Sequence, residues 1–363
     1  MTLHHDGTES AQPGRRGVLT AGIGTGLALL GTGTGAAHAA TRTVPSERRT
    51  SPSSLSGESY EISRGEQRLI VTELGAGLRS YTVKGHQLLD TFSPDSYPTG
   101  ASYGQVLIPW PNRIDHGTYT FDGTEQVLPW SEPAQANAIH GLTRWMNWEV
   151  VERSTSRLVM GLTLHAQPGY PFVLRLRQTY ELTEHGLLVT NAARNTGADR
   201  VPYGVGAHPY FTLGTEYIDD IVLTLPARKW FRTDDRGIPL PPPVPVAGTS
   251  FDFLRPRRLR DTVLDTGFAE LVRNGDGLAV VRMTSPESPV SLEVWQDRQH
   301  EFLQVYTGDT LPDPDGRRRG LAIEPYSCAA NAFNNGYGLK VLPPGGEFRA
   351  QWGVRPVVRG RRR

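Results

Sequence analysis

The sequence has little of what several common classes of protein require. Its 363 residues include one cysteine, Cys328, which excludes an internal disulfide framework and any metal site built from several cysteines. The formal net charge is only +1, so no strong field for nucleic acid or an anionic membrane is expected. Long helical periodicity is missing, as are the strand, glycine turn and helix units of phosphate loops and dinucleotide sites. We therefore predict no nucleotide cofactor and no nucleic-acid partner.

The N-terminus has the pattern of a twin-arginine export signal. Arg15 and Arg16 follow a polar lead and precede a glycine-rich, weakly apolar stretch that ends in "AHA" at residues 37–39. The apolar stretch is too short and too rich in glycine for stable membrane insertion. We predict that residues 1–39 form the signal and that the mature protein is extracellular or periplasmic. The alternative is an N-terminus that is basic and apolar by chance.

The segments that flank the predicted domain are polar or basic. Residues 40–58 are rich in Ser and Pro, which is typical of a disordered linker. Residues 358–363 form a basic tail, either solvated or in contact with a polyanion. Residues 59–357 remain as one domain, within the size that all-β domains reach.

The predicted domain reads as strands almost throughout. In "FVLRLRQTYEL", the apolar residues Leu174, Leu176, Tyr180 and Leu182 alternate with polar ones, which is the period of a half-buried strand. Similar segments are separated by Gly, Pro, Asn and Asp clusters. Residues 239–248 hold several prolines and cannot form a central strand. The pattern predicts an all-β fold, a large antiparallel β-sandwich.

Four stretches carry polar groups that packing alone does not require. Asn112 and Arg113 follow "PWP", whose stiff backbone suits a rigidly placed guanidinium. His140 lies in "NAIHG", and His208 lies in "GVGAHPYFTLG", where a hydrogen-bonded core histidine is the alternative. Glu324 lies in the apolar strand "LAIEPY", where an unpaired carboxylate costs several kcal/mol, on the order given for buried charges.

Taken in order, these motifs resemble the aldose 1-epimerase (galactose mutarotase) family. The resemblance covers residues 60–354 and is carried by "NRI", "NAIHG", "HPYF", "VLDTGF", "FLQVYTG" and "IEP". It implies a large antiparallel β-sandwich of the galactose mutarotase type. It also implies interconversion of the α and β anomers of a free aldose such as glucose or galactose, without cofactor or metal.

The resemblance also implies roles for individual residues. His208 in "HPYF" matches the family's general acid, and Glu324 in "IEP" matches its general base. Arg113, with Asn112 beside it, matches a residue that binds sugar hydroxyls, and His140 matches a second histidine of the site.

Two further substrate-binding residues follow from the same comparison of motifs. Asp265 in "VLDTGF" matches a carboxylate that accepts from sugar hydroxyls, and Gln304 in "FLQVYTG" matches a polar contact near the base. Trp110 or Tyr306 is expected either to pack on the apolar face of the sugar or to belong to the core. The preferred sugar stays open.

The chemistry explains these residue types. A base removes the proton of the C1 hydroxyl, an acid protonates the ring oxygen, and the C1–O5 bond breaks to give the open aldehyde. Rotation about C1–C2 and reclosure give the other anomer. Each positioned proton transfer contributes ~10²–10⁴-fold. We expect Glu324 to be ionised and its charge to raise the pKa of His208.

Other functions remain possible from the residues alone. A glycosidase would use Glu324 and Asp265 as its two carboxylates, but His208 would then have no catalytic role. A metal site from His140, His208 and a carboxylate lacks ligand spacing. A non-catalytic sugar-binding protein would need Arg113 but not both His208 and Glu324. A phosphosugar epimerase of the same superfamily fits less well with export.

Overall fold

The computed structural model describes residues 54–93 and 101–359. The predicted export signal and residues 40–53 of the predicted linker lie outside the described residues, as do residues 360–363 of the tail. Residues 54–58 were predicted to be disordered linker, but they are hydrogen-bonded to residues 73 and 74. Backbone hydrogen bonds join Glu73 N to Glu58 O at 2.8 Å and Leu74 N to Ser56 O at 3.2 Å, and Ser56 is buried. These bonds fix a segment whose composition alone suggested disorder.

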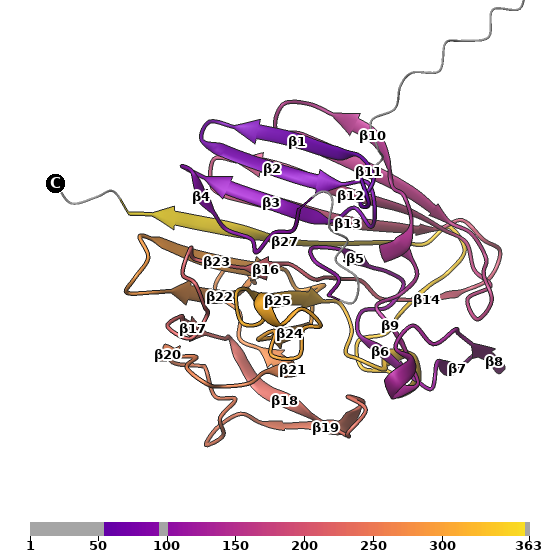
Figure 1. The fold of residues 1–363 in the computed structure, drawn as a ribbon. Coiled ribbons are helices and arrows are strands. Elements are labelled where there is room, and N and C mark those ends of the chain that lie inside the picture. Colours follow the sequence, from indigo (N-terminus) through magenta and orange to yellow (C-terminus); the bar gives the residue numbers. More distant parts are fainter. Residues whose placement is uncertain (1–53, 94–100, 360–363) are drawn as a thin grey trace, which may run out of the picture. The chain divides into compact units, whose positions relative to one another are not determined.

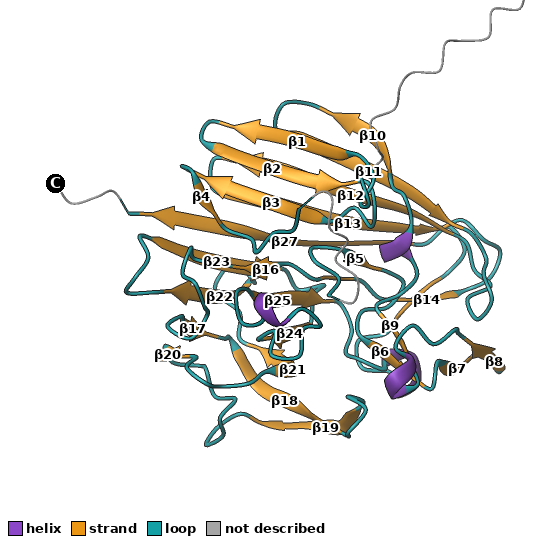
Figure 2. Ribbon diagram, in the orientation of Figure 1, coloured by secondary structure: helices purple, strands orange, loops and turns teal. Residues whose placement is uncertain are grey.

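Antiparallel strands are the predominant regular elements of the described part of the chain (Figure 2). The largest sheet has nine strands. Across its width they are β10 (Glu149–Arg153), β11 (Arg157–Leu164), β12 (Leu174–Thr183), β13 (Gly186–Asn195), β27 (Glu347–Val358), β23 (Val290–Gln296), β22 (Ala279–Thr284), β17 (Val222–Thr224) and β20 (Arg257–Arg258). Figure 1 shows the long strand β27 running between β13 and β23.

The second large sheet carries the candidate site. Its strands in order are β19 (Pro239–Pro245), β18 (Ala227–Thr233), β21 (Asp265–Leu271), β24 (Phe302–Tyr306), β25 (Leu321–Tyr326), β15 (Gly206–Ala207) and β5 (Val106–Leu107), with β16 (Tyr210–Phe211) also paired to β25. The proline-rich segment predicted to avoid a central position is β19, at the edge of this sheet.

Smaller elements complete the described fold. A four-stranded sheet contains β1 (Ser59–Arg64), β2 (Gln67–Thr72), β3 (Leu78–Val83) and β4 (His86–Gln87). The two-stranded ribbons are β6 (Arg113–Asp115) with β9 (Asn137–Ile139), β7 (Thr118–Phe121) with β8 (Thr124–Val127), and β14 (Val201–Tyr203) with β26 (Lys340–Leu342). The helical elements are α1 (Ala332–Asn335) and the 3-10 turns η1 (Pro133–Gln135), η2 (Thr143–Trp145) and η3 (Pro314–Gly316). Among these elements no helix is long and apolar enough to cross a membrane.

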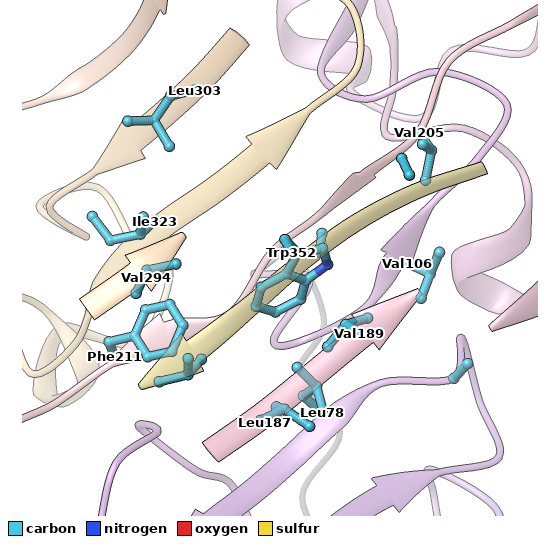
Figure 3. Close-up of a cluster of buried hydrophobic side chains, with 14 of the residues drawn as sticks. Leu78, Val106, Leu187, Val189, Val205, Phe211, Val294, Leu303, Ile323 and Trp352 are labelled. Carbon is cyan, nitrogen blue, oxygen red and sulfur yellow. The ribbon is translucent and has the colours of Figure 1, made fainter. Parts of the chain in front are cut away.

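The alternation of residue types decides which face of each strand is buried. In β12, Leu174, Leu176, Tyr180 and Leu182 are buried, whereas Arg175 and its neighbours at every second position point outward, as the sequence predicted. Side chains from both large sheets meet in one core. It includes Val189 and Trp352 from the nine-stranded sheet and Leu303 and Ile323 from the eight-stranded sheet (Figure 3). The predicted β-sandwich is thereby confirmed.

Candidate active site

Strand register brings three predicted site residues onto one face of the eight-stranded sheet. Glu324 of β25 lies opposite Gln304 of β24, which lies opposite Gly267 of β21, two residues from Asp265. Because side chains alternate between faces, Glu324, Gln304 and Asp265 share the face that points away from Leu303 and Ile323 in the core. The site therefore lies on the outer face of this sheet.

His208 reaches the same place from the short strands that flank it. β15 and β16 both pair with β25, at Gly206 with Tyr326 and at Tyr210 with Ala322. His208 lies midway between these two pairs, so its position along the sheet matches that of Glu324. The His208 Nε2 and Glu324 Oε2 atoms are 3.5 Å apart, and both side chains are almost fully buried.

The Asn112–Arg113 pair and His140 are held together at the start of the β6–β9 ribbon. Asn112 and His140 both have positive φ, 56° and 63°, so each occupies the left-handed region next to a strand end. His140 N donates to Asn112 O at 2.8 Å, and Asn112 N donates to His140 Nδ1 at 3.2 Å. This reciprocal pair of bonds assigns the acceptor role to Nδ1 and fixes the ring of His140.

Aromatic packing fixes the second histidine. The ring of His208 stacks on that of Tyr210 with 5.0 Å between centroids, and the ring of His140 meets His208 edge-on at 5.2 Å. His208 Nδ1 is buried and has no hydrogen-bond partner in the described structure, whereas Nε2 faces Glu324. The ring is therefore oriented mainly by its neighbours' rings.

Arg113 is clamped by a carboxylate that the sequence did not reveal. Its Nε and Nη2 donate to the two oxygens of Glu132 at 2.8 and 2.9 Å, a bidentate geometry that fixes the guanidinium plane. Arg113 Nη1 lies 3.9 Å from Asp265 Oδ2, and Gln304 Nε2 donates to Asp265 Oδ1 at 2.6 Å. Arg113 is thus held as a hydrogen-bond donor and Asp265 as a hydrogen-bond acceptor, each in a fixed orientation beside the other.

These groups line one cavity of about 680 Å³, here called cavity A. Of the predicted site residues, cavity A is lined by Asn112, Arg113, His140, His208, Asp265 and Glu324. Gln304 does not reach cavity A and contacts Asp265 from the other side. Of the two aromatic residues considered for sugar packing, Tyr306 lines the cavity, but Trp110 is buried in the core beside Phe333.

Several residues of the site were missed by the sequence reasoning. Arg144 and Trp145, from η2, line cavity A, and the Arg144 guanidinium lies 4.5 Å from the Trp145 ring centroid. Glu132 and Tyr210 also line it, and the hydroxyl of Tyr326 donates to Glu324 Oε2. Only Tyr326 carried a usable signal, because a residue two positions from Glu324 in a strand must share its face.

Comparison with known proteins agrees with this geometry. The sequence profile described as aldose 1-epimerase matches residues 58–355. The chain belongs to the aldose 1-epimerase family. Family membership and a galactose mutarotase-like fold were both predicted from the motifs, and both are confirmed.

Three known proteins illustrate the similarity. The uncharacterized Escherichia coli protein YihR is 34% identical over 295 residues, which covers 81% of this chain and 92% of YihR. The Escherichia coli aldose 1-epimerase is 28% identical over 61% of this chain and 65% of its own length. The solved structure of a Caenorhabditis elegans GalM/aldose epimerase homologue is 20% identical, with a TM-score of 0.75, over 84% of this chain and 99% of its own.

Burial dominates the titration of this aldose 1-epimerase family site. Desolvation raises the pKa of Glu324 well above its ordinary value, while the hydrogen bond from Tyr326 acts in the opposite direction. Desolvation also lowers the pKa of His208 to about 3, with a contribution from the charge of Arg144. The expectation that the neighbouring carboxylate would raise the pKa of His208 is wrong. Burial thus favours the uncharged form of both partners, a neutral imidazole on His208 and a protonated carboxyl group on Glu324.

His140 is shifted in the same direction as His208. Burial lowers its pKa well below the ordinary value, and the charges of Arg144 and Arg113 add to the effect. His140 is therefore neutral at physiological pH. Because its Nδ1 accepts from Asn112 N, its Nε2 carries the hydrogen and can donate to an oxygen in cavity A. In the described part of the chain, no group of three or more His, Cys, Asp or Glu side chains is arranged to hold a metal ion.

Proposed function

We propose that this protein is a mutarotase, which interconverts the α and β anomers of a free aldose by opening and reclosing the ring. The observation that carries the proposal is the buried His208–Glu324 pair, whose facing atoms are 3.5 Å apart in a cavity that also presents Arg113 and Asp265. Mutarotation needs one proton donor and one acceptor close together, with further groups to orient the ring. Cavity A supplies both requirements.

In this proposal the His208–Glu324 pair holds one exchangeable proton. One proton is enough for mutarotation, because the proton given to the ring oxygen is replaced by the one taken from the C1 hydroxyl. A bound sugar offers hydroxyls to the pair, which offsets part of its desolvation and favours transfer of the proton from Glu324 to His208. The Glu324 carboxylate then takes the proton of the C1 hydroxyl, and His208 gives its proton to the ring oxygen as the C1–O5 bond breaks. Reclosure on the other face of the aldehyde reverses both transfers. The pair ends with the same single proton.

The other side chains of cavity A have orienting roles in this proposal. Arg113 donates to a sugar hydroxyl, and Asp265 accepts from one, each held by its own partner, Glu132 or Gln304. His140 and Asn112 complete the polar wall. Tyr306 and the half-exposed Trp145 lie on the cavity lining, where an aromatic ring can cover the apolar face of a sugar.

The direct test is polarimetry of freshly dissolved α-glucose, α-galactose and several pentoses with purified protein. We expect at least one sugar to reach anomeric equilibrium faster than in buffer. Absence of acceleration for every aldose tried would overturn the proposal.

Substitution of the pair tests the assigned roles. Glu324→Gln and His208→Asn should each lower kcat by roughly 100-fold or more, because each removes one proton-transfer group, while sugar binding stays measurable by calorimetry. Glu181→Gln, at a half-buried position on the outward-facing side of β12, is the matched control and should keep full activity. Near-normal turnover by Glu324→Gln would show that the base is misassigned. Wild-type protein that binds sugar without turnover would indicate a non-catalytic sugar-binding protein.

A further inference from the structure

Glu132 lines cavity A but has no part in the proposed proton transfers. It lies just before η1 in a short loop, and its side chain is only 18% exposed. Two backbone hydrogen bonds close this loop, from Glu132 N to Asn137 O at 3.0 Å and from Asn137 N to Glu132 O at 3.2 Å. The loop therefore holds a carboxylate at a defined place in the wall of the site.

The Glu132 carboxylate is also fixed through its side chain. Asn137 is fully buried, and its Nδ2 donates to Glu132 Oε2 at 3.1 Å and to the Arg236 carbonyl oxygen at 3.0 Å. Arg236 lies in the turn between β18 and β19 and forms an ion pair with Asp115 of β6. Contacts within the protein thus set the position of Glu132.

Glu132 decides which N–H groups of Arg113 can reach a sugar. It accepts from Nε and Nη2, which uses two of the five N–H groups of the guanidinium. Gly237 covers one face of the group, since a Cβ placed on Gly237 would lie 2.7 Å from Arg113 Nη1. The remaining N–H groups on Nη1 and Nη2 are the ones available to a hydroxyl, and the bidentate contact sets their direction.

Glu132 is also the closer counter-charge of Arg113. The Arg113 side chain is only 14% exposed, and a buried cation is costly unless it is paired. Asp265 pairs with it weakly, because Asp265 Oδ2 lies 3.9 Å from Arg113 Nη1 and the Asp265 side chain is about half exposed (49%). The bidentate contact with Glu132, at 2.8 and 2.9 Å, therefore compensates most of the Arg113 charge.

This compensation affects the acid–base pair. The charge of Arg113 stabilises the Glu324 carboxylate and so lowers the pKa of Glu324, against the larger effect of burial. A negative charge on Glu132 offsets that pull and helps Glu324 to keep its proton. The charged and titratable groups that act on the pair are His140, Arg144, Tyr210, Tyr326, Asp265 and Arg113.

We propose that Glu132 is a positioning residue with two effects. It directs Arg113 toward a sugar hydroxyl, and it offsets the Arg113 charge so that the His208–Glu324 pair keeps its single proton. This inference rests on the proposed mutarotase function and adds a residue that regulates the same site.

Two substitutions separate the geometry of Glu132 from its charge. Glu132→Asp keeps a carboxylate but is too short for the same bidentate contact, whereas Glu132→Gln keeps the length and loses the charge. Both should raise KM for an accelerated aldose about fivefold or more, with a smaller change in kcat, because Arg113 is no longer held in one orientation. Glu125→Gln, at an exposed position of β8, is the matched control and should leave KM unchanged. An unchanged KM in both Glu132 variants would overturn the positioning role.

The pH profile isolates the effect of the charge. In Glu132→Gln the Arg113 charge is no longer offset, so the pKa of Glu324 should fall. The basic limb of kcat/KM should then move to lower pH by roughly half a unit or more. In Glu132→Asp and in Glu125→Gln the basic limb should stay at its wild-type position. A purely structural role would raise KM in both Glu132 variants without moving the limb of Glu132→Gln, and that result would overturn the charge effect.

Infrared titration measures the same proton without turnover. The C=O stretching band of protonated Glu324, assigned by its loss in Glu324→Gln, should disappear at lower pH in Glu132→Gln than in the wild type. If Glu132→Gln does not fold, Arg113→Gln is compared with the double variant Arg113→Gln/Glu132→Gln, since both lack the buried cation. The double variant should titrate at lower pH than Arg113→Gln. Equal titrations of these two variants would overturn the charge effect.

These measurements also separate the role of Glu132 from the mutarotase function. Acceleration of no aldose would overturn the function, and the infrared titration would still decide whether Glu132 controls the proton of Glu324. Acceleration of an aldose together with an unmoved titration would leave the function intact and overturn the proposed charge effect of Glu132.

Discussion

At the scale of single residues, the surroundings of His208 and Glu324 decide how the site responds to pH. Both groups are buried, and burial lowers the pKa of His208 to about 3 while it raises that of Glu324. The two groups titrate as a coupled pair, so a kinetic profile reports the pair and not one residue. The form with one proton is the active one in the proposed reaction.

The first prediction concerns the pH dependence of kcat/KM. The acidic limb marks the gain of a second proton by His208, and its low pKa places this limb well below neutral pH. The basic limb marks the loss of the proton held by Glu324, and its raised pKa moves this limb upward. We expect a broad plateau through neutral pH, measured by polarimetry with spontaneous mutarotation subtracted. An inflection near about 6.5, the ordinary pKa of histidine, would contradict this titration order.

Tyr326 allows a sharper test of the same pair. Its hydroxyl donates to Glu324 Oε2 and thereby stabilises the carboxylate, so Tyr326→Phe should raise the pKa of Glu324 further. The basic limb of the pH profile should then move to higher pH. Tyr337→Phe is the control, because Tyr337 packs against the same aromatic cluster but does not line cavity A. A basic limb that does not move would exclude Tyr326 as a group that tunes Glu324.

The sequence predicted the main residues of the site, but it did not predict the side chains that hold them in place. Motifs indicated His208 and Glu324, although 115 intervening positions separate them and only the pairing of β15, β16 and β25 brings them together. Glu132 gave no signal, because one acidic residue in a polar loop does not show that it will meet Arg113. Trp110 was ambiguous, since its neighbouring prolines do not reveal which way the indole points.

At the scale of secondary-structure elements, the alternation of apolar and polar residues predicted which face of a strand is buried. The sequence did not predict which strands pair with each other. The buried face of β12 and the edge position of β19 follow from local rules about side-chain direction and missing N–H donors. By contrast, the eight-stranded sheet joins strands from β5 to β25, and no local pattern fixes that order. Side-chain packing between distant strands decides it.

Gly353 in β27 illustrates how closely the central strands approach. A Cβ on Gly353 would lie 2.3 Å from the Leu187 carbonyl oxygen and 2.7 Å from the Trp295 ring. Gly353→Ala should therefore lower the free energy of unfolding by about 1–3 kcal/mol through overpacking, measured by denaturant titration. Gly275→Ala, where no atom lies within 4 Å of the new Cβ, should change it little. Equal stabilities of the two variants would show that the strands adjust without cost.

At the scale of the whole chain, the N-terminal region leads to a prediction about location. Residues 1–39 lie outside the described residues, and the proposal of export rests on the Arg15–Arg16 pair and the "AHA" sequence. We expect native protein recovered outside the cytoplasmic membrane to begin near Ala40, as determined by N-terminal sequencing. Replacing both arginines with lysine should retain the protein inside the cell. Native protein with an intact Met1 or Thr2 start would refute export with cleavage.

The edges of the two large sheets have a consequence for the behaviour of the protein at high concentration. An exposed edge strand is a template for a strand of another molecule, because its N–H and C=O groups are unpaired. Here five of the seven residues of β19 are proline, β10 is bulged and carries charged side chains, and the outer strands β20 and β5 are two residues long. These four edge strands are therefore poor templates for a strand of another native copy. Aggregation should instead follow the population of unfolded chains, so solubility and thermodynamic stability should rise and fall together.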